Sequence, residues 1–299
     1  MRYYFNIADI RICMESEIEV AWNSYISAFL CAPEESYDEY YECECVDVLP
    51  CEGELLYRDQ FQMVFGNGEY EERLHFFWGQ DEPCMLYKEY EEKKVIYLNR
   101  RFMESFLRED NYSIFNAMAF EKVLMKHRGV VLHSSFIIWE GQAILFTAPS
   151  GTGKSTQAML WEKCRGAVIA NGDRTILKMK NGQVYAYGMP ICGSSDICRN
   201  VTVPVRAIIY LSQAMENQIE EMDLKQRIKK LISEITINFF DRNFLETAME
   251  MIAEIAEHVD MYHYSCTKEE RAVDVLEDRL KEKEHGSNKA FKSYRTGDM

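Results

Sequence analysis

The chain has 299 residues, enough for one large domain or two modest ones, and its hydrophobic content of 47% is typical of a globular protein. The net charge of −15 is uneven, because residues 1–100 hold 22 acidic against 8 basic side chains while the remainder is close to neutral. The excess of negative charge in residues 1–100 argues against nucleic acid and anionic membrane as partners, because both are negatively charged and would be repelled. It permits a basic peptide to dock, although a solvated surface is the favoured interpretation.

The sequence contains no run of eighteen apolar residues, and its N-terminus lacks the apolar core of a signal peptide. We therefore expect a cytoplasmic protein without a membrane-spanning helix. In a reducing compartment its ten scattered cysteines are mostly small buried hydrophobes. The one tight group, Cys43, Cys45 and Cys51, does not have a standard zinc spacing, so a metal there is the disfavoured alternative.

The first 110 residues have the pattern of a β-rich domain. Short apolar runs broken by polar turns predict strands within 3–14, 61–70, 74–79, 84–90 and 94–102. Gly66-Asn67-Gly68 predicts a hairpin turn. The segment "EESYDEYYECEC", residues 34–45, is too acidic to predict as core, and we expect a loop or an edge strand.

From Ser113 onward helices and strands alternate. Ser113 is predicted to cap a helix over 114–128, and Glu140-Gly141-Gln142 a turn between two strands within 130–147. Further along, the pattern predicts a helix over 155–166, a strand over 167–173, a hairpin around Asn181-Gly182, a strand over 203–213, helical material over 224–258, a strand over 261–266, and a helix from the capping box of Thr267 and Glu270 to about Glu284.

These elements indicate an α+β or α/β protein with a mixed sheet. We expect a β-rich domain over 1–110, a nucleotide-binding domain over 111–284 and a disordered polar tail over 285–299.

The strongest motif is "LFTAPSGTGKSTQAMLW", residues 145–161. Ala148, four residues and then Gly153-Lys154-Ser155 follow the phosphate-binding P-loop pattern, with an apolar strand before it and a helix after it. Glycine lets the backbone N–H groups curl around phosphate, Lys154 supplies charge for the β and γ oxygens, and the Ser155 hydroxyl is suited to Mg²⁺. The residues predicted to bind the nucleotide are Ser150, Gly151, Thr152, Gly153, Lys154, Ser155 and Thr156.

A P-loop needs an acid to complete its metal site, and "AVIANGDR" offers Asp173 eighteen residues after Ser155. The alternative is a turn aspartate, since Asn-Gly-Asp is also turn chemistry. Gly193 to Ser195 could form a second anion nest with Arg199 reaching a phosphate, or a surface loop whose arginine pairs with an acid. His133 alone on an apolar strand is more often a core residue than a catalyst.

The order "VVLHSSFIIWEGQAILFTAPSGTGKSTQAMLW", "VIANGDR", "YAYGMPICGSSDICRN" and "VPVRAIIYLSQAMEN" resembles the HPr kinase/phosphorylase superfamily, which is structurally related to the phosphoenolpyruvate carboxykinases. The resemblance covers about residues 128–212, with weaker agreement at the C-terminal end. Residues 1–110 are more similar to the front part of small HPr-kinase-like proteins encoded beside peptide-maturation genes.

The resemblance implies ATP and Mg²⁺ as cofactors, Ser155 and Asp173 as metal ligands, and a place for His133 beside the transferred phosphate. It also implies a possible homo-oligomer, because HPr kinases form hexamers. The chain departs from the family at one position: HPr kinases have two adjacent aspartates where this chain has Gly172-Asp173. The acid usually given the proton-handling role is therefore missing.

The resulting hypothesis is an ATP-dependent kinase that transfers the γ-phosphoryl group to a hydroxyl, most simply a serine of a peptide or small protein. Its predicted catalytic residues are Lys154, Asp173, His133 and Arg199. Two alternatives stay open: a nucleotide-binding switch or scaffold without transferase activity, which Gly172 favours, and a kinase of a small molecule such as free serine.

Overall fold

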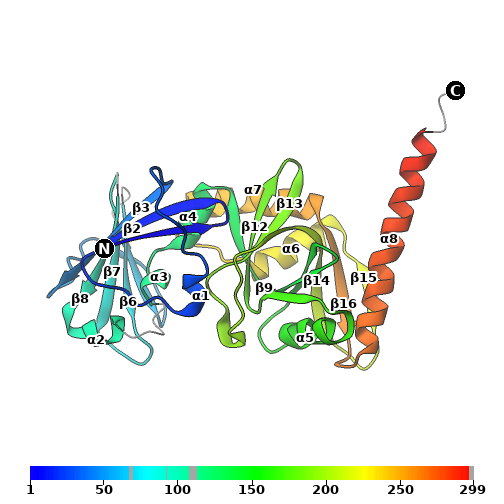
Figure 1. Cartoon of the computed structure of the whole chain (residues 1–299), viewed down its shortest axis with the longest axis horizontal. Coiled ribbons are helices and arrows are strands. Elements are labelled where there is room, and N and C mark those ends of the chain that lie inside the picture. Colours follow the sequence, from blue (N-terminus) through cyan, green and yellow to red (C-terminus); the bar gives the residue numbers. More distant parts are fainter. Residues whose placement is uncertain (67–69, 92, 108–112, 296–299) are drawn as a thin grey trace.

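A computed structural model of the chain describes residues 1–66, 70–91, 93–107 and 113–295. Within these ranges the strands form two eight-stranded sheets, each with helices packed on it. Figure 1 shows the first sheet at the N-terminal end of the molecule and the second beside it, with the last helix projecting at the far end. The fold is mixed α/β.

The first sheet contains the strands predicted from the N-terminal apolar runs and two that were not predicted. Its order is β1 (Arg2–Ile7), β2 (Ile10–Ser16), β3 (Glu39–Val46), β8 (Lys94–Asn99), β7 (Pro83–Glu89), β6 (Glu71–Phe76), β5 (Gln62–Gly66) and β4 (Glu54–Arg58). The predicted Gly66-Asn67-Gly68 turn lies partly outside the described residues. On either side of it, β5 and β6 pair antiparallel.

The expectation of a loop or an edge at 34–45 is confirmed for residues 34–38, which form a loop, and is wrong for 39–45, because β3 is an interior strand. It pairs parallel with β2 on one side and with β8 on the other. Tyr41 and Cys43 alternate into the core, which is the two-residue period of a half-buried strand. Glu39 lies on the same buried face, where its carboxylate contacts Lys94 at 2.5 Å and Lys126 at 2.8 Å.

The second sheet contains the strands predicted after residue 129. Its order is β10 (Gln142–Thr147), β9 (Gly129–Trp139), β12 (Arg174–Lys180), β13 (Gln183–Tyr187), β14 (Thr202–Gln213), β16 (Asp260–Cys266) and β15 (Gln218–Glu221), with β11 (Val168–Asn171) paired to β9. Both predicted tight turns are confirmed by left-handed backbone: φ is 51° and 77° at Glu140 and Gly141, and 53° and 76° at Asn181 and Gly182.

Strand β9 changes partners along its length. Its first half, Gly129 to His133, pairs with β12, and its second half, from Ser134, pairs with β10 and β11. Strand β14 does the same, pairing first with β13 and then with β10 and β16. Ligand sites often lie where strands change neighbours, and His133 stands at such a point.

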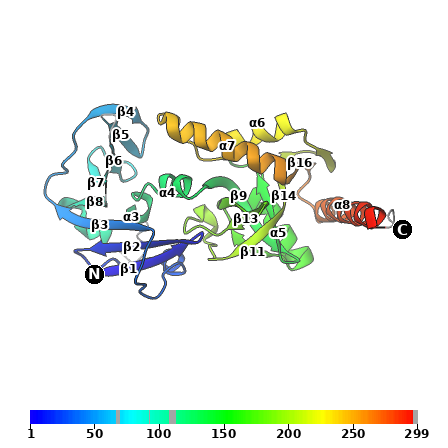
Figure 2. The same ribbon diagram turned by 90° about the horizontal axis from the view of Figure 1, so that it is seen from above.

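Helices cover both faces of the second sheet (Figure 2). Helices α5 (Lys154–Arg165) and α8 (Arg271–Arg295) pack on one face, and α6 (Leu224–Glu234) and α7 (Arg242–His258) on the other. The short helices are α1 (Ser24–Ser27), η1 (Arg100–Phe102), α2 (Met103–Phe106), α3 (Ser113–Asn116), α4 (Phe120–Lys126) and η2 (Gly193–Ser195). None of the helices in the described ranges is long and apolar enough to cross a membrane.

Three predicted helix boundaries differ from the structure. The helix expected over 114–128 is split into α3 and α4, because Ala119 is left-handed with φ of 49°. The helical material over 224–258 is interrupted by residues 235–241, which we call the connector. The last helix begins at Arg271, since Thr267 Oγ1 accepts from the N–H of Glu269 rather than closing a capping box, and it continues to Arg295.

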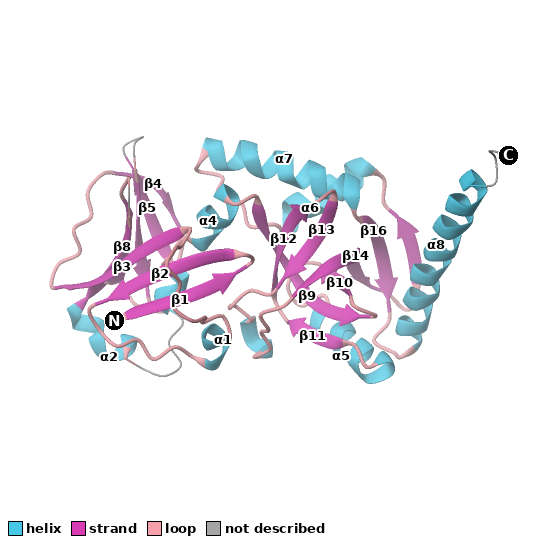
Figure 3. Cartoon of the chain, turned by 45° about the horizontal axis from the view of Figure 1, so that its top comes forward, coloured by secondary structure: helices cyan, strands magenta, loops and turns pink. Residues whose placement is uncertain are grey.

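The connector joins the two sheets. Its first residues run along β9, where the Thr236 N–H donates to the Val131 carbonyl at 2.9 Å. Its last residues reach the first sheet, where the Phe240 ring stacks on Tyr57 with centroids 5.2 Å apart. Figure 3 shows the N-terminal end of α7, which follows the connector, reaching the side of the first sheet. A hydrophobic core that includes Phe5 and Ile176 also spans both sheets.

A buried ion-pair network holds the connector in place. The Arg73 guanidinium contacts Glu71 and Glu121, the latter at 2.5 Å, and lies 5.8 Å from the centroid of the Phe240 ring. The Asn238 amide also donates to Glu121 at 3.0 Å. Because the Arg73 side chain is only 4% exposed, each of its partners compensates a charge that water does not reach.

Glu121→Ala should therefore lower the free energy of unfolding by about 3 kcal/mol, because it leaves the buried Arg73 with one carboxylate fewer. Urea denaturation followed by circular dichroism measures this. The matched control is Glu246→Ala, whose partner Arg242 is exposed, and it should change little. Equal effects of the two substitutions would contradict the role given to the network.

Candidate functional site

The loop from Ala148 to Ser155 connects the end of β10 to the start of α5, as the motif predicts. Gly151 and Gly153 have φ of 79° and 120°, and a Cβ atom on either would meet nothing within 4 Å. Glycine is needed there for backbone conformation rather than for space. The loop is braced from β14, because the Gln213 amide donates to the carbonyls of Gly151 and Thr152 at 3.3 and 3.2 Å.

Lys154 begins α5 and is buried, and its ammonium donates to the Ala148 carbonyl at 2.9 Å. Burial lowers the pKa of Lys154, while the carboxylates of Glu234 and Asp173 act in the opposite direction. Thr147, directly before the loop, donates from Oγ1 to the carbonyl of His133 at 2.8 Å, so the loop starts beside the part of β9 that carries His133. Ser155 is exposed near the start of the helix, as is Ser150 before it, and Thr152 and Thr156 are half-buried.

Asp173 lies in the interruption between β11 and β12. The Asn171 side chain accepts from the N–H groups of Asp173 and Arg174 at 2.9 Å each. Its amide nitrogen donates to the carbonyls of Met189 and Ile191, in the loop after β13. The Asp173 carbonyl in turn accepts from the N–H of Ser134 on β9. Asp173 is thus a turn residue, and the hydrogen bonds of this turn also fix the position of its carboxylate. The two interpretations of Asn-Gly-Asp are therefore compatible.

His133 stands between two carboxylates. Its Nε2 lies 3.3 Å from Asp173 Oδ1, and its Nδ1 lies 3.5 Å from Oε2 of Glu234, whose side chain is 5% exposed. Arg174 is opposite His133 in the β9–β12 register, and its Nε is 3.4 Å from Asp173 Oδ2. Interaction with His133, assisted by the charges of Arg174 and Lys154, holds the pKa of Asp173 below its usual value despite partial burial.

The neighbouring loop explains why position 172 is glycine in this chain. A Cβ atom on Gly172 would lie 2.0 Å from Ser195 Oγ and 2.3 Å from Ser195 Cβ. Ser195 is held by its own hydrogen bond to the Cys192 carbonyl at 2.6 Å. An aspartate at 172 therefore cannot fit while the loop keeps this conformation. Ser195 occupies the space that the first acid of a pair would need.

Arg199 is exposed, and its side chain and backbone bond the edge of β11. Its Nε donates to the Ile169 carbonyl at 3.1 Å and its N–H to the Ala170 carbonyl at 2.9 Å. Gly193, on the same loop, packs against Asp173, since a Cβ atom there would lie 2.9 Å from the Asp173 Cβ and Cγ. The loop thus contacts the site, and the catalytic role of Arg199 stays a prediction.

Sequence reasoning missed two charged residues of this cluster. Glu234 is the last residue of α6 and has no motif around it, so only the fold brings it to His133. Arg174 directly follows Asp173, and its pairing with His133 depends on the strand register. The signal that could have revealed Arg174 was its place at the start of a strand beside the predicted acid.

The residues present fit a nucleotide with a divalent cation. The open space around Gly151 and Gly153 leaves room for a phosphate chain, and a buried ammonium lies at the same loop. Hydroxyl and carboxylate oxygens, which Ser155 and Asp173 supply, are the donors that Mg²⁺ prefers.

The sequence model of one protein family, described as SynChlorMet cassette protein ScmC, matches residues 113–268. That span is more than half of the chain, and the chain belongs to this family. It includes His133, the 148–155 loop, Asp173 and Glu234.

A solved structure titled as the Hpr(Ser) kinase/phosphatase from Coxiella burnetii also matches, with a TM-score of 0.32 and 12% identity. The match covers 51% of this chain and 98% of that chain. So distant a likeness carries no argument about activity. No curated protein matches the chain in sequence.

Gly172→Ala should destabilise the protein by about 2 kcal/mol, because the added methyl group overlaps Ser195. Ser195→Gly removes the overlapping atoms, so the double variant should recover at least about 1 kcal/mol of that loss. Urea denaturation of the wild type, both single variants and the double variant gives the coupling energy. Strictly additive effects would show that the two residues do not compete for this space.

Proposed function

We propose that the protein is an ATP-dependent kinase that transfers the γ-phosphoryl group to a hydroxyl, with a serine of a peptide or small protein as the acceptor. The observation that carries the proposal is that the 148–155 loop starts beside His133, to whose carbonyl Thr147 Oγ1 donates at 2.8 Å, and that the His133 ring lies between Asp173 and Glu234. A cation, a metal-binding carboxylate and a flanked imidazole are the groups that phosphoryl transfer uses.

Bound ATP would supply the phosphoryl group, and Mg²⁺ would neutralise its developing charge. In the proposal, the N–H groups around Gly151 and Gly153 bind phosphate oxygens, and Lys154 leaves the Ala148 carbonyl to bind the β and γ oxygens. Ser155 and Asp173 hold the metal ion. The depressed pKa of Asp173 supports this role, because the carboxylate stays ionised at and above its usual titration range.

His133 and Glu234 take the place of the missing acid in this scheme. The acceptor hydroxyl would attack the γ-phosphorus as the bond to the departing ADP breaks. Its proton would pass to His133 Nε2, which is unprotonated when the ring carries its proton on Nδ1 toward Glu234 and the Asp173 carboxylate is engaged by Mg²⁺. The carboxylate of Glu234, 3.5 Å from Nδ1, then stabilises the imidazolium. A loose transition state asks little of the base, so Gly172 does not by itself prevent transfer.

Gly172 nevertheless favours a second candidate, a nucleotide-dependent switch or scaffold that binds ATP without transferring phosphate. The side chain of Ser195 fills the position where a second acid would stand. Binding of Mg-ATP without labelling of any peptide or metabolite would support the switch. Label on free serine alone would support the small-molecule kinase.

The ten cysteines, which all lie in the described ranges, are free thiols. Free thiols fit a reducing compartment, and we place the proposed reaction in the cytoplasm.

Lys154→Met should lower transfer of radiolabelled phosphate from ATP at least about 100-fold, because it removes the charge nearest the transferred group. Lys163→Met is the matched control, since Lys163 is an exposed residue of the same helix that pairs with Glu270. Its transfer rate should stay within about twofold of wild type. Equal rates for the two variants would contradict the proposed role of the 148–155 loop.

A further inference from the structure

A cleft of about 500 Å³ lies between the first sheet, the connector and the start of β12. This volume is within the range of small-ligand sites. The walls of the cleft include the aromatic rings of Phe61 and Trp78 and the polar side chains of Arg73, His75, Arg174 and Thr236. One end of this cleft is therefore built by the strand that follows Asp173.

The cleft adjoins the candidate site through Arg174. Its Nε lies 3.4 Å from Asp173 Oδ2, and its Nη1 donates to Thr236 Oγ1 at 3.3 Å. Because Arg174 is opposite His133 in the register, both side chains are on the same face of the sheet. That face also carries Val131 and Ile176, which belong to the core shared with the first sheet. A ligand in the cleft would thus be next to the proposed reacting groups.

Two buried polar groups of the cleft wall have unmet hydrogen-bonding capacity. Arg73 uses Nε and Nη1 on Glu71 and Glu121, but its Nη2 has no hydrogen-bond partner among the described residues. The same holds for His75 Nε2. Burial lowers the pKa of His75 to about 4, so its ring is neutral at pH 7. Buried polar atoms normally have partners, and an oxygen-bearing ligand would supply them.

The outer wall of the cleft is aromatic and exposed. Phe61 and Trp78 are 45% and 75% exposed, and their ring centroids lie 5.5 Å apart. Phe76, Phe77 and Met85 continue the apolar surface inward. Exposed aromatic rings beside buried donors suit a ligand with an apolar side chain next to polar backbone, which is the chemistry of a peptide.

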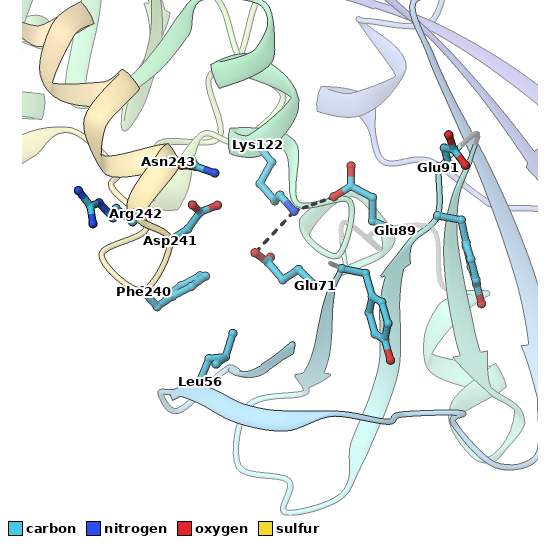
Figure 4. Close-up of a pocket in the computed structure, with 11 residues that line it drawn as sticks. Leu56, Glu71, Glu89, Glu91, Lys122, Phe240, Asp241, Arg242 and Asn243 are labelled. Carbon is cyan, nitrogen blue, oxygen red and sulfur yellow. Dashed lines mark hydrogen bonds and ion pairs between the residues drawn. The ribbon is translucent and has the colours of Figure 1, made fainter. Parts of the chain in front are cut away.

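A larger neighbouring cavity, of about 820 Å³, is less suited to the acceptor (Figure 4). Two of its acids are already engaged, because Lys122 contacts Glu89 at 2.6 Å and Glu71 at 3.5 Å. None of the residues that line it belongs to the His133–Asp173 cluster. The Arg73 network separates this cavity from the cleft, since Glu71 lines one and Glu121 the other.

We propose that the cleft binds the part of the acceptor peptide that flanks the hydroxyl to be phosphorylated. An aromatic or large aliphatic side chain of the peptide packs against Phe61 and Trp78. Backbone carbonyl oxygens of the peptide accept from Arg73 Nη2 and the His75 ring. This inference rests on the proposed kinase function and adds the region of the chain that selects the acceptor. The first sheet thereby becomes part of the substrate site.

The test uses seven-residue peptides with one serine in glycine flanks, in which one phenylalanine is placed in turn at each flanking position. Transfer of radiolabel from ATP gives kcat and KM for each peptide. At one or more positions the phenylalanine should lower KM about tenfold. In Trp78→Ala, whose side chain is mostly exposed and so not needed for folding, that preference should disappear while kcat changes little.

Met215→Ala is the matched control, because Met215 is 93% exposed and does not line the cleft. It should keep the full preference. An unchanged preference in Trp78→Ala, or label on glycine-flanked and phenylalanine peptides alike, would overturn the assignment of the cleft. Label on free serine but on no peptide would also overturn it.

Calorimetric titration of Mg-ATP into the wild-type protein separates the two proposals. Absence of binding would remove the kinase function itself. If Mg-ATP binds and phosphate is transferred, but the peptide preference is unchanged by the cleft substitutions, only the assignment of the acceptor site is wrong.

Discussion

His133 and Asp173 meet where β9 exchanges β12 for β10 and β11, and the candidate site depends on that meeting. The interruption after β11 lets the chain present a carboxylate instead of continuing a regular ladder. Asn171 satisfies the N–H groups that the interruption leaves without strand partners. The same geometry brings Glu234 behind the imidazole. One local irregularity thus places the Asp173 carboxylate beside both His133 and Arg174.

The connector extends this arrangement to the first sheet. It follows Glu234 directly, passes Thr236 beside Arg174 and ends with Phe240 against Tyr57. Because buried charges between the sheets are compensated by one another, the two parts of the molecule cannot separate without exposing or stranding them. The connector therefore links the first sheet to the region of His133, and a ligand between the sheets would contact residues of both sheets.

Local sequence signals predicted the parts of the fold that local chemistry decides. The turns at Gly141 and Gly182 need left-handed backbone that glycine adopts readily, and the loop before Lys154 needs it for the same reason. The interior position of β3 could not be predicted, because its acids are neutralised by lysines more than fifty residues away. Glu234 was missed for the same reason, because no sequence pattern around it indicates that it lies beside His133.

The central claim is that the 148–155 loop and Asp173 together bind a nucleotide and its metal ion. Calorimetric titration of ATP with and without Mg²⁺, into wild type and Asp173→Asn, tests it most directly. In wild type, Mg²⁺ should tighten ATP binding at least about tenfold, and the variant should lose most of that gain, a difference of about 1.4 kcal/mol. An equal gain in both proteins would contradict the claim, because the metal would then be held without Asp173.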